Sequence, residues 1–233
     1  MSLYEDVDGF LKQGGVDIFG VADISSFEEA EPGYRPQDIL PTARSVLAYG
    51  IRMFRFPRIE KLNSGNIPEG ITEYTANFFI AAGILDHLSY RLAMFLQDQG
   101  FQSLSIPAGP PYDGVGLRGI VSHKYAAELA GIGHRGLCDL LLTEKYGPRI
   151  RLTTVITEAS LPASRSEPGN LCEEHQNRCD FACVTACPAE AISQTDGIDK
   201  SRCDRYNEIV LSKGPIKIRC GRCVRACPVG TQG

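Results

Sequence analysis

Eight of the nine cysteines of this 233-residue chain lie in its last third, and two of them are followed directly by proline. One group spans residues 172–188, the other spans residues 203–228, and each ends in a C-x3-C-P run. Cysteines that recur ahead of such an ending are typical ligands of 4Fe–4S clusters. Since each cluster takes four thiolates, eight cysteines predict two clusters and a protein that moves single electrons.

The ligands of each cluster follow from a rule of bacterial ferredoxins, in which the cysteine before proline ligates the other cluster. We therefore expect each cluster to take three cysteines from one motif and the fourth from the other. Both motifs depart from the C-x2-C-x2-C-x3-C-P run, so Cys172 and Cys203 are assigned from the total of eight rather than from spacing. The predicted first cluster has the ligands Cys172, Cys179, Cys183 and Cys227, and the predicted second cluster has Cys187, Cys203, Cys220 and Cys223.

Two other uses of cysteine agree less well with this pattern. Structural zinc sites usually take thiolates as C-x2-C pairs, and only Cys220 and Cys223 form such a pair. Zinc also gives no reason for a proline after Cys187 and Cys227. A disulfide scaffold is typical of small secreted domains, whereas this chain is long, has an odd number of cysteines and shows no export signal.

The composition is that of a globular protein without a basic surface. Hydrophobic residues make up 43% of the chain, charged residues make up 22%, and the formal net charge is −4. This charge predicts no nucleic-acid partner. No apolar run approaches the length that spans a bilayer, and the acidic N-terminal segment lacks the charged-then-apolar order of an export signal. We therefore expect a cytoplasmic protein without a membrane partner.

Hydrophobic periodicity predicts an α+β domain ahead of the cysteine motifs. The composition breaks at residues 162–169, so we place the domains at residues 1–162 and 163–233. Residues 57–70 are predicted to be a loop, and residues 144–148 a hairpin turn. The expected helices are 3–13, 72–98 and 122–130, and the expected strands are 16–22, 45–53, 101–106, 137–143 and 150–158.

Three glycines, at 114, 116 and 119, match the dinucleotide fingerprint G-x-G-x-x-G letter for letter. That fingerprint requires a strand directly before it and a helix directly after it. Here the proline-rich residues 107–111 separate the strand from the first glycine. We therefore interpret this segment as a loop whose backbone could border a cofactor.

Two pairs of basic residues could bind an anionic group. His123 and Lys124 open a predicted helix, and His134 and Arg135 lie in a glycine-rich loop. A helix start attracts anions, although a solvated first turn carries the same residue types. Cys138, the ninth cysteine, falls in an apolar predicted strand, and we interpret it as a small core residue rather than a ligand.

Four segments upstream of the cysteine motifs resemble epoxyqueuosine reductases. They are still more similar to the short iron–sulfur relatives of these enzymes, and the likeness continues through both motifs. Reductive dehalogenases share the same plan. The four segments are VDIFGVAD (16–23), YRPQDILPTARSVLAYG (34–50), SHKYAAELAGIG (122–133) and KYGPRIRLTTVITEASLP (145–162).

This resemblance implies a nitroreductase-like corrinoid-binding domain followed by a ferredoxin-like domain with two 4Fe–4S clusters. It implies that the clusters pass electrons to a base-off cobalamin, which reduces a small substrate or the corrinoid of a partner protein. A low-potential donor such as ferredoxin or flavodoxin would supply the electrons under anaerobic conditions. The chain has no D-x-H-x-x-G motif for a corrinoid with a histidine lower ligand.

Three departures from the family limit what the resemblance implies. The chain stops six residues after Cys227, without the helical-repeat tail that epoxyqueuosine reductases use on tRNA, so we expect no tRNA substrate. The family's Arg-Gly-Arg-Asp-Tyr-His segment is missing, and Pro107 stands where the catalytic aspartate is expected. The candidate proton donors are Tyr112, Asp113, Tyr74 and His134. The candidate cofactor-binding residues are Gly109, Gly114, Gly116, His123, Lys124, Gly133 and Arg135.

A rival hypothesis is an electron-transfer protein of the ferredoxin type that binds no corrinoid. Its N-terminal domain would then be a docking module. The missing aspartate favours this rival, and the retained N-terminal segments favour the corrinoid enzyme. A flavin or haem in the same pocket is a third alternative.

Overall fold

A four-stranded sheet lies at the centre of the N-terminal part of the fold, with the strand order β1-β2-β6-β3. β2 and β6 pair along their whole length, from Ser45 opposite Thr157 to Arg52 opposite Ile150. All neighbouring strands are antiparallel, in agreement with the predicted mixture of helices and strands. The strands are β1 (Ile18–Asp23), β2 (Ser45–Arg52), β3 (Ser103–Ile106) and β6 (Ile150–Thr157).

The computed structural model describes residues 2–54, 68–164, 169–212 and 218–230. The chain divides into two units, and each unit draws on three separate stretches of sequence. We expected one boundary near residue 162, whereas two upstream stretches join the unit that holds the cysteine motifs, because they pack around those motifs. The first unit comprises residues 1–52, 81–134 and 150–169, and the second comprises residues 53–80, 135–149 and 170–233.

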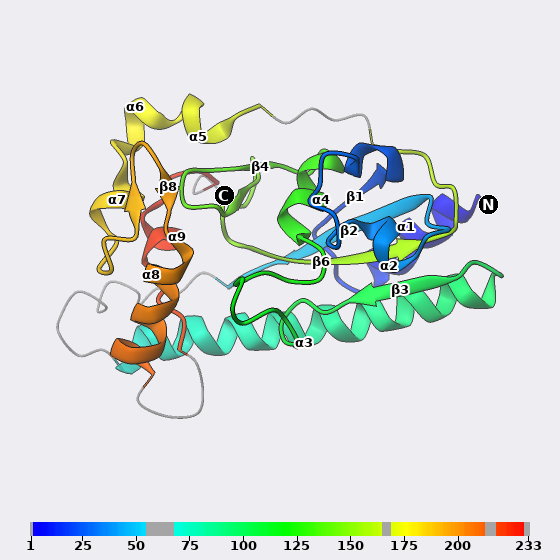
Figure 1. Cartoon of the computed structure of the whole chain (residues 1–233), viewed down its shortest axis with the longest axis horizontal. Coiled ribbons are helices and arrows are strands. Elements are labelled where there is room, and N and C mark those ends of the chain that lie inside the picture. The colour runs from blue at the N-terminus through cyan, green and yellow to red at the C-terminus, as the bar shows by residue number, and fades with distance from the viewer. Residues whose placement is uncertain (1, 55–67, 165–168, 213–217, 231–233) are drawn as a thin grey trace. The chain divides into compact units, whose positions relative to one another are not determined.

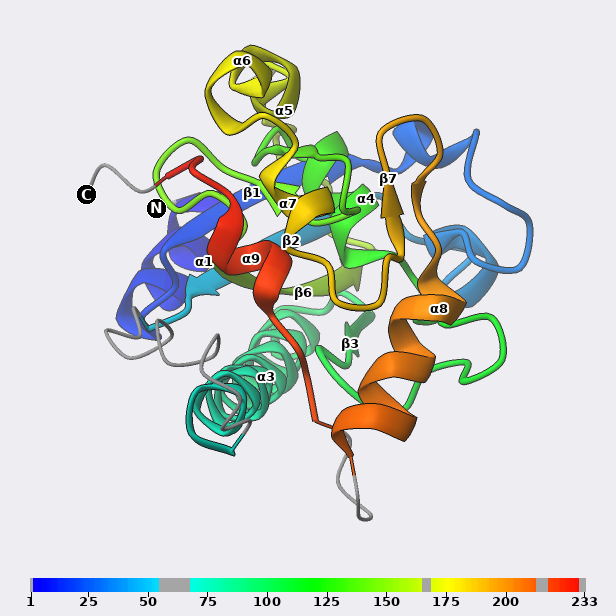
Figure 2. The same cartoon turned by 90° about the vertical axis from the view of Figure 1, so that its left-hand side faces the viewer.

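In the first unit, helices cover both faces of the sheet, because successive side chains of a strand point to opposite faces. Leu47 and Tyr49 of β2 face a hydrophobic core shared with α1 (Leu3–Gln13) and with residues 81–96 of α3 (Pro68–Asp98). α4 (His123–Leu129) contacts β1, β2 and β6. Figures 1 and 2 show α3 and α4 on opposite sides of these strands.

Side-chain caps fix the starts of two of the predicted helices. Ser2 and Glu5 form a reciprocal capping box at α1, in which each side chain accepts a hydrogen bond from the other's backbone N–H. The Ser122 hydroxyl accepts a hydrogen bond from the Tyr125 N–H and caps α4. α3 begins at Pro68, inside the predicted loop 57–70, and residues 57–67 of that loop lie outside the described residues.

Two short helices complete the first unit. They are η1 (Ile24–Phe27) and α2 (Pro36–Ile39). Ile24 and Ile39 pack against a second small core that contains Leu40 and Ile156. This packing ties the proline-rich segment after β1 to the sheet.

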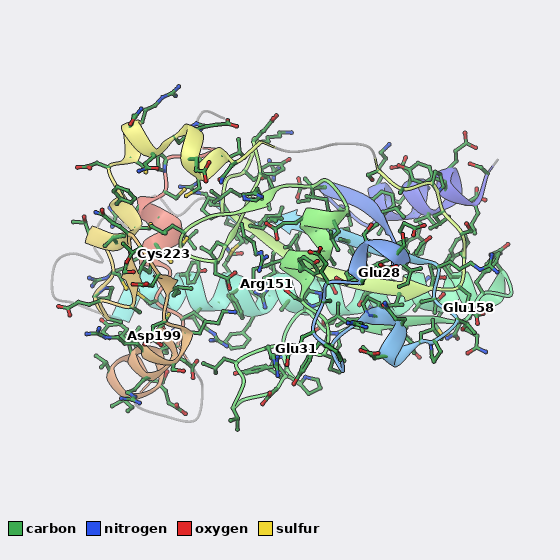
Figure 3. All side chains as sticks on the ribbon, turned by 45° about the horizontal axis from the view of Figure 1, so that its top comes forward. Glu28, Glu31, Arg151, Glu158, Asp199 and Cys223 are labelled. Atoms are coloured by element: carbon green, nitrogen blue, oxygen red, sulfur yellow. The ribbon has the colours of Figure 1, made fainter. Side chains whose placement is uncertain are left out.

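The second unit is built from short helices joined by tight turns. β7 and β8 form a small hairpin, with Ile192 opposite Ile198. Asp199 caps the following helix by accepting a hydrogen bond from the Arg202 N–H, and it is labelled in Figure 3. The elements are α5 (Leu171–Glu174), α6 (Gln176–Cys179), α7 (Ala182–Thr185), β7 (Ile192–Ser193), β8 (Gly197–Ile198), α8 (Lys200–Arg205), the π-helical segment η3 (Tyr206–Leu211) and α9 (Arg222–Ala226).

The predicted hairpin around residues 144–148 is wrong. Only β5 (Leu141–Leu142) forms within residues 137–143, and it pairs with β4 (His134–Arg135) instead of β6. The Gly136 N–H donates to the Leu140 carbonyl and closes a turn where a strand was expected. A second tight turn, with Gly147 at a φ of 54°, links Thr143 to Gly147. Two turns in close succession leave no room for a long strand.

α3 is the one helix among the described residues that is long and apolar enough to cross a membrane, over Tyr74–Asp98. The expectation that no apolar stretch reaches this length was therefore too strict. Part of this stretch, 39% of its most apolar window, is buried within the protein. Core helices of soluble proteins pass the same test, so the finding is weak evidence for a membrane.

Gly20 of β1 allows α4 to approach the sheet closely. A Cβ atom at this position would collide with the Ala130 carbonyl oxygen and lie 3.1 Å from the Ala130 Cβ. We predict that Gly20→Ala lowers the free energy of unfolding by about 1–3 kcal/mol, because backbone must move to admit the methyl group.

The matched control is Gly9→Ala in α1, where no atom lies within 4 Å of the added Cβ. Alanine is the better helix former, so this variant should be neutral or more stable by about 0.5–1 kcal/mol. Urea unfolding of both variants tests the prediction. Equal stability of the two variants would contradict the proposed close approach.

Candidate metal centre

The two cysteine motifs fold into the same local structure. In each, a residue in the left-handed region precedes a short helix, namely Phe181 at φ 51° before α7 and Gly221 at φ 65° before α9. The second residue of each helix is a cysteine, Cys183 or Cys223, and the cysteine–proline pair begins four residues later. α7 and α9 contact each other and lie side by side in Figure 2. Two repeated cysteine turns in contact are the arrangement that a paired cluster site requires.

The four cysteines assigned to the first cluster line one cavity of the second unit. Three of them come from the first motif, and the fourth, Cys227, comes from the second motif. Leu137, Leu142 and Val229 give the cavity an apolar wall. His175 also lines it and donates a hydrogen bond from Nδ1 to the Leu171 carbonyl over 3.0 Å. The four cysteines are Cys172, Cys179, Cys183 and Cys227.

An upstream stretch, residues 135–149, supports Cys172 in this cavity. The Leu137 N–H donates a hydrogen bond to the Cys172 Sγ over 3.4 Å. Gly136 permits this approach, because a Cβ atom there would lie 2.9 Å from the Leu142 Cδ1 and 3.3 Å from the Cys172 Sγ. A backbone donor that points at a ligating sulfur stabilises negative charge on it.

The same stretch also holds the segment that carries Cys227. The Arg149 guanidinium donates from Nη2 to the Cys227 carbonyl over 2.7 Å and from Nη1 to the Val229 carbonyl over 2.9 Å. Gly147 lies against the same segment, since a Cβ atom there would collide with the Val229 carbonyl oxygen. These contacts fix the backbone that points the Cys227 thiol into the cavity.

Three of the four cysteines assigned to the second cluster also lie within one another's electrostatic reach. Cys187, from the first motif, raises the pKa of both Cys203 and Cys220. The Ala191 N–H donates a hydrogen bond to the Cys187 Sγ over 3.3 Å. The fourth cysteine of the set, Cys223, is labelled in Figure 3. Seven of the eight cysteines thus group in the crossed manner that the motif rule predicts. The place of Cys223 in the second set, and the binding of iron by either set, stay predictions.

Burial is the main cause that raises the pKa of four of these thiols. Thiols in this state hold their protons at neutral pH. A metal or cluster that binds such thiols must displace their protons, so the predicted cluster binding should release protons. The four are Cys172, Cys203, Cys220 and Cys227.

A single metal ion and a 4Fe–4S cluster require different arrangements of ligands. No three His, Cys, Asp or Glu side chains among them are placed to hold one metal ion. A 4Fe–4S cluster instead spreads four thiolates around a cube of iron and sulfide. Four thiols around one cavity match that requirement.

Cys138 is buried, as expected, but it lies among the cysteines of the motifs. It is 6% exposed and lines the same cavity as Cys183. A hydrogen bond with Cys183 lowers the pKa of Cys138, but a hydrogen bond with Cys223 and burial outweigh it and raise that pKa to about 12. A thiol that contacts one cysteine of each predicted set is a neighbour of both sites.

His123 has a structural use that the sequence did not predict. Its Nδ1 lies 2.8 Å from the Thr154 hydroxyl, and its Nε2 lies 2.9 Å from the Pro107 carbonyl. A carbonyl can only accept, so Nε2 carries the proton and Thr154 donates to Nδ1. Burial lowers the pKa of His123 to about 4, so the ring is neutral at pH 7. With both nitrogens engaged and the ring neutral, His123 presents no positive charge to an anionic group.

Two further hydrogen bonds hold the loop after β3. The Ala108 N–H donates to the Asp86 carboxylate over 2.6 Å, and the Ala108 carbonyl accepts from the Arg151 guanidinium. Arg151 lies on β6 and is labelled in Figure 3. Gly109, a candidate cofactor-binding residue, follows directly, and a Cβ atom there would touch only the Ala82 methyl at 3.8 Å.

The glycines of the G-x-G-x-x-G run form a surface turn rather than a dinucleotide turn. Asp113 closes this turn by accepting hydrogen bonds from the N–H groups of Val115 and Gly116. These bonds hold the pKa of Asp113 below its ordinary range, so the carboxylate has no proton to donate at neutral pH. A Cβ atom at Gly114 would meet no atom within 4 Å.

Arg118 ties this turn to an earlier segment of the first unit. Its guanidinium lies over the Tyr34 ring, 3.6 Å from the centroid, and pairs with Glu31 at 2.5 Å. Glu31 is labelled in Figure 3. These two contacts of Arg118 favour a structural role for the loop around Asp113.

The four candidate proton donors are divided between the two units. Tyr112 and His134 belong to the first unit with Asp113, and His134 pairs with Glu128 at 3.4 Å. Tyr74 belongs to the second unit, where its ring packs on the backbone at Gly221, between two predicted ligands.

The other candidate cofactor-binding residues lie in α4 or follow it in the sequence. Lys124 is half-buried in that helix, and Gly133 is buried in the loop behind it. Arg135 belongs to the second unit and pairs with Asp139 at 3.8 Å. Their binding of a cofactor stays a prediction.

Sequence reasoning missed the residues that support the cysteines. They are Leu137, Arg149 and Asn207, and none lies next to a cysteine of the motifs in the sequence. For Arg149 a signal existed, because it lies in the KYGPRIR segment that carried the family resemblance. For Leu137 the donor is a backbone N–H, which leaves no mark in the sequence.

No protein-family model matches the chain, but named relatives do. The tetrachloroethene reductive dehalogenase of Dehalobacter restrictus is 27% identical over 188 residues, which cover 81% of this chain and 29% of the relative. The epoxyqueuosine reductase of Bacillus cereus is 24% identical over 260 residues, which cover 97% of this chain and 64% of the relative. The chain thus spans less than two thirds of the length of either relative.

Solved structures of both kinds share the fold. An epoxyqueuosine reductase with a tRNA-Tyr stem loop superposes with a TM-score of 0.68 at 20% identity, covering 99% of this chain and 66% of that one. A reductive dehalogenase described as suggesting a mechanism for B12-dependent dehalogenation gives 0.67 at 19% identity, covering 98% and 32%. The resemblance to both families that the sequence indicated is therefore confirmed.

One expectation about partners is wrong. We expected no nucleic acid, from the acidic net charge and from the absence of a helical-repeat tail. Epoxyqueuosine reductases are among the homologues, and one that shares this fold is solved with a tRNA stem loop. Net charge reports the average of a surface, and it does not exclude a nucleic-acid partner within such a family.

The neutral His123 ring predicts a loss of stability in acid. Its pKa in the folded protein, about 4, lies below the ordinary value of 6.5, so the unfolded chain binds the proton first as the pH falls. The free energy of unfolding should therefore fall between pH 6.5 and pH 4, by up to roughly 3 kcal/mol from this residue.

His123→Asn should flatten that pH dependence, because asparagine does not titrate. The control is His87→Asn, which changes an exposed histidine of α3 and should keep the wild-type slope. Urea unfolding of the three proteins at several pH values between 4 and 7 gives the slopes. An unchanged slope in His123→Asn would show that the ring is not held neutral.

The crossed grouping predicts the effect of a single ligand substitution. Cys227→Ala should remove the first cluster, although Cys227 lies in the second motif, so iron should fall from about eight to about four per chain. Iron analysis and EPR of the reduced protein give the result, with Cys172→Ala as the reference for the lost signal.

Cys138→Ser is the matched control, since its thiol lines the same cavity. It should keep the full iron content. Loss of only the second cluster in Cys227→Ala would overturn the crossed assignment, and loss of iron in Cys138→Ser would make Cys138 a ligand.

Proposed function

We propose that the protein is an iron–sulfur oxidoreductase whose two 4Fe–4S clusters pass low-potential electrons to a cobalamin held by the first unit. In this proposal the first unit is a nitroreductase-like corrinoid domain, and the second is a ferredoxin-like domain. The observation that carries it is the crossed grouping of the cysteines. Cys227 lies in the cavity of the first motif, and Cys187 lies near Cys203 and Cys220.

The second unit supplies what two clusters need from a protein. Eight thiols are available, four of them around one cavity whose wall is otherwise largely apolar. Backbone N–H groups at Leu137 and Ala191 point at one sulfur of each predicted set. Arg149 holds the backbone of the crossing cysteine Cys227. Together these groups fix the ligands and stabilise the negative charge that the thiolates bring.

The cobalamin part of the proposal is supported by the relatives, among them the reductive dehalogenase linked to B12-dependent dehalogenation. When bound, the clusters carry single electrons and the cobalamin supplies the metal that reduces the substrate. In the first unit, His123 uses both ring nitrogens and His134 pairs with Glu128. A corrinoid in that unit is therefore expected to bind base-off without either imidazole as its lower ligand.

The substrate in this proposal is a small molecule or the corrinoid of another protein. The second candidate function is an electron carrier without a corrinoid. It is favoured by Asp113, whose carboxylate closes its own turn and stays ionised, and by Pro107 at the expected place of the catalytic aspartate. The two functions differ in whether the protein binds cobalamin.

An anaerobic titration of the cluster-loaded protein with cob(II)alamin, followed by EPR, tests the proposal. We expect a base-off signal that lacks the nitrogen splitting of the lower ligand. The control is the same titration with a protein that carries Cys172→Ala and Cys203→Ala and lacks ligands of both clusters. A wild-type signal that stays base-on at saturating protein would exclude the corrinoid enzyme in favour of the electron carrier.

A further inference from the structure

Asn207 is a buried polar residue within the second unit, at 6% exposure, and the motif rule gives it no role. It lies in η3, the π-helical segment that continues directly from α8. Single π-helical turns are rare and occur often at functional sites. Cys203 precedes Asn207 by four residues in the same continuous helix, so both side chains lie on one helical face.

The carboxamide of Asn207 joins two of the cysteines assigned to the second cluster. Its Nδ2 lies 3.8 Å from the Cys203 Sγ and is placed to donate a hydrogen bond to it. Its Oδ1 accepts a hydrogen bond from the Cys220 N–H over 2.9 Å. Cys203 stands far upstream of Cys220 in the sequence, and this side chain spans the gap between them in the fold.

The orientation of the carboxamide is fixed by its partners. The Cys220 N–H can only donate, so the oxygen of the carboxamide must face it. The NH2 group is therefore left to face the Cys203 sulfur. Exchanging the two ends would oppose two donors at Cys220.

The surrounding backbone holds Asn207 in place. The Asn207 carbonyl accepts hydrogen bonds from the N–H and the hydroxyl of Ser212, over 3.0 Å and 2.5 Å. The Ser212 hydroxyl in turn accepts from the Ile218 N–H over 2.6 Å. Thr75 accepts a hydrogen bond from the Arg219 N–H over 3.0 Å on the other side of the same segment. The side chain is thus positioned by a network that includes the backbone before Cys220.

The geometry points to Asn207 as a positioning residue of the second cluster that also sets its reduction potential. The inference rests on the iron–sulfur half of the proposed function. Reduction adds negative charge to a cluster and its thiolates, and an N–H group that points at a ligating sulfur stabilises that charge. The Nδ2 donor therefore raises the potential of the second cluster, and the Oδ1 acceptor keeps Cys220 within reach of the same cluster.

Two substitutions separate these roles. Asn207→Asp keeps an oxygen for the Cys220 N–H but replaces the donor with an acceptor, so it should keep the full iron content and lower the potential of the second cluster. Asn207→Ala removes both interactions, so it should also lower the iron content toward one cluster per chain. The holoprotein is reconstituted anaerobically, and its clusters are followed by iron analysis and EPR-monitored redox titration.

The matched control is Asn170→Asp. Asn170 caps α5 beside Cys172, and its Oδ1 accepts a hydrogen bond from the Glu173 N–H over 3.3 Å. Aspartate keeps this cap and adds the same charge near the first cysteine set. It should leave the signal of the second cluster at its wild-type potential. The EPR signal that is missing from Cys203→Ala identifies the second cluster.

Wild-type potentials and full iron content in both Asn207 variants would overturn the inference. A potential shift confined to the first cluster would overturn it as well, because it would place Asn207 at the wrong site. A wild-type protein that takes up no iron would instead refute the proposed function. The two failures are therefore distinguishable in one set of samples.

Discussion

Each cysteine motif contributes one thiol to the group formed by the other motif, and this exchange is the constraint on which the second unit depends. Cys227 shares a cavity with the cysteines of the first motif, and Cys187 lies near those of the second. The exchange requires the two motif helices, α7 and α9, to lie together, and they do. Both motifs then use the same local structure: a left-handed residue precedes the helix, and a cysteine–proline pair follows it.

Such short helices have little hydrophobic surface of their own, so other parts of the chain hold them. Arg149 and Gly147 secure the exit at Cys227, Leu137 supports Cys172, and Tyr74 packs on the backbone at Gly221. These residues come from two stretches far upstream of the motifs. The second unit therefore contains both the cysteine motifs and segments that we predicted to belong to the N-terminal domain.

The sequence predicted those features that follow from local periodicity or fixed spacing. The long hydrophobic pattern of α3, the capped start of α4 and the alternating strands β2 and β6 were all visible in single segments. The grouping of seven of the eight cysteines agrees with the rule for C-x3-C-P motifs, which depends only on the fixed spacing of the ligands. The predicted strand over residues 137–143 was wrong, because its apolar residues pack around turns at Gly136 and Gly147 rather than along a sheet.

The supporting residues could not have been found in this way. Asn207 binds the backbone of Cys220, 13 residues away, and Arg149 binds the backbone of Cys227, 78 residues away. A short sequence pattern cannot predict a contact over such a separation. His123 was predicted to open a helix, which it does, but its neutral state depends on burial against Thr154 and Pro107. Long-range hydrogen bonds of this kind are set by tertiary packing, which local patterns do not encode.

The interleaving of the two units has a consequence for how the protein is made. Arg149 is synthesised long before the carbonyls of Cys227 and Val229 that it binds, and so is Leu137 before Cys172. On the ribosome the first unit can close around its sheet while the thiols of the second unit still lack their final partners. In the proposed function, iron loading then follows translation, and the thiols of the second unit must stay reduced during that interval.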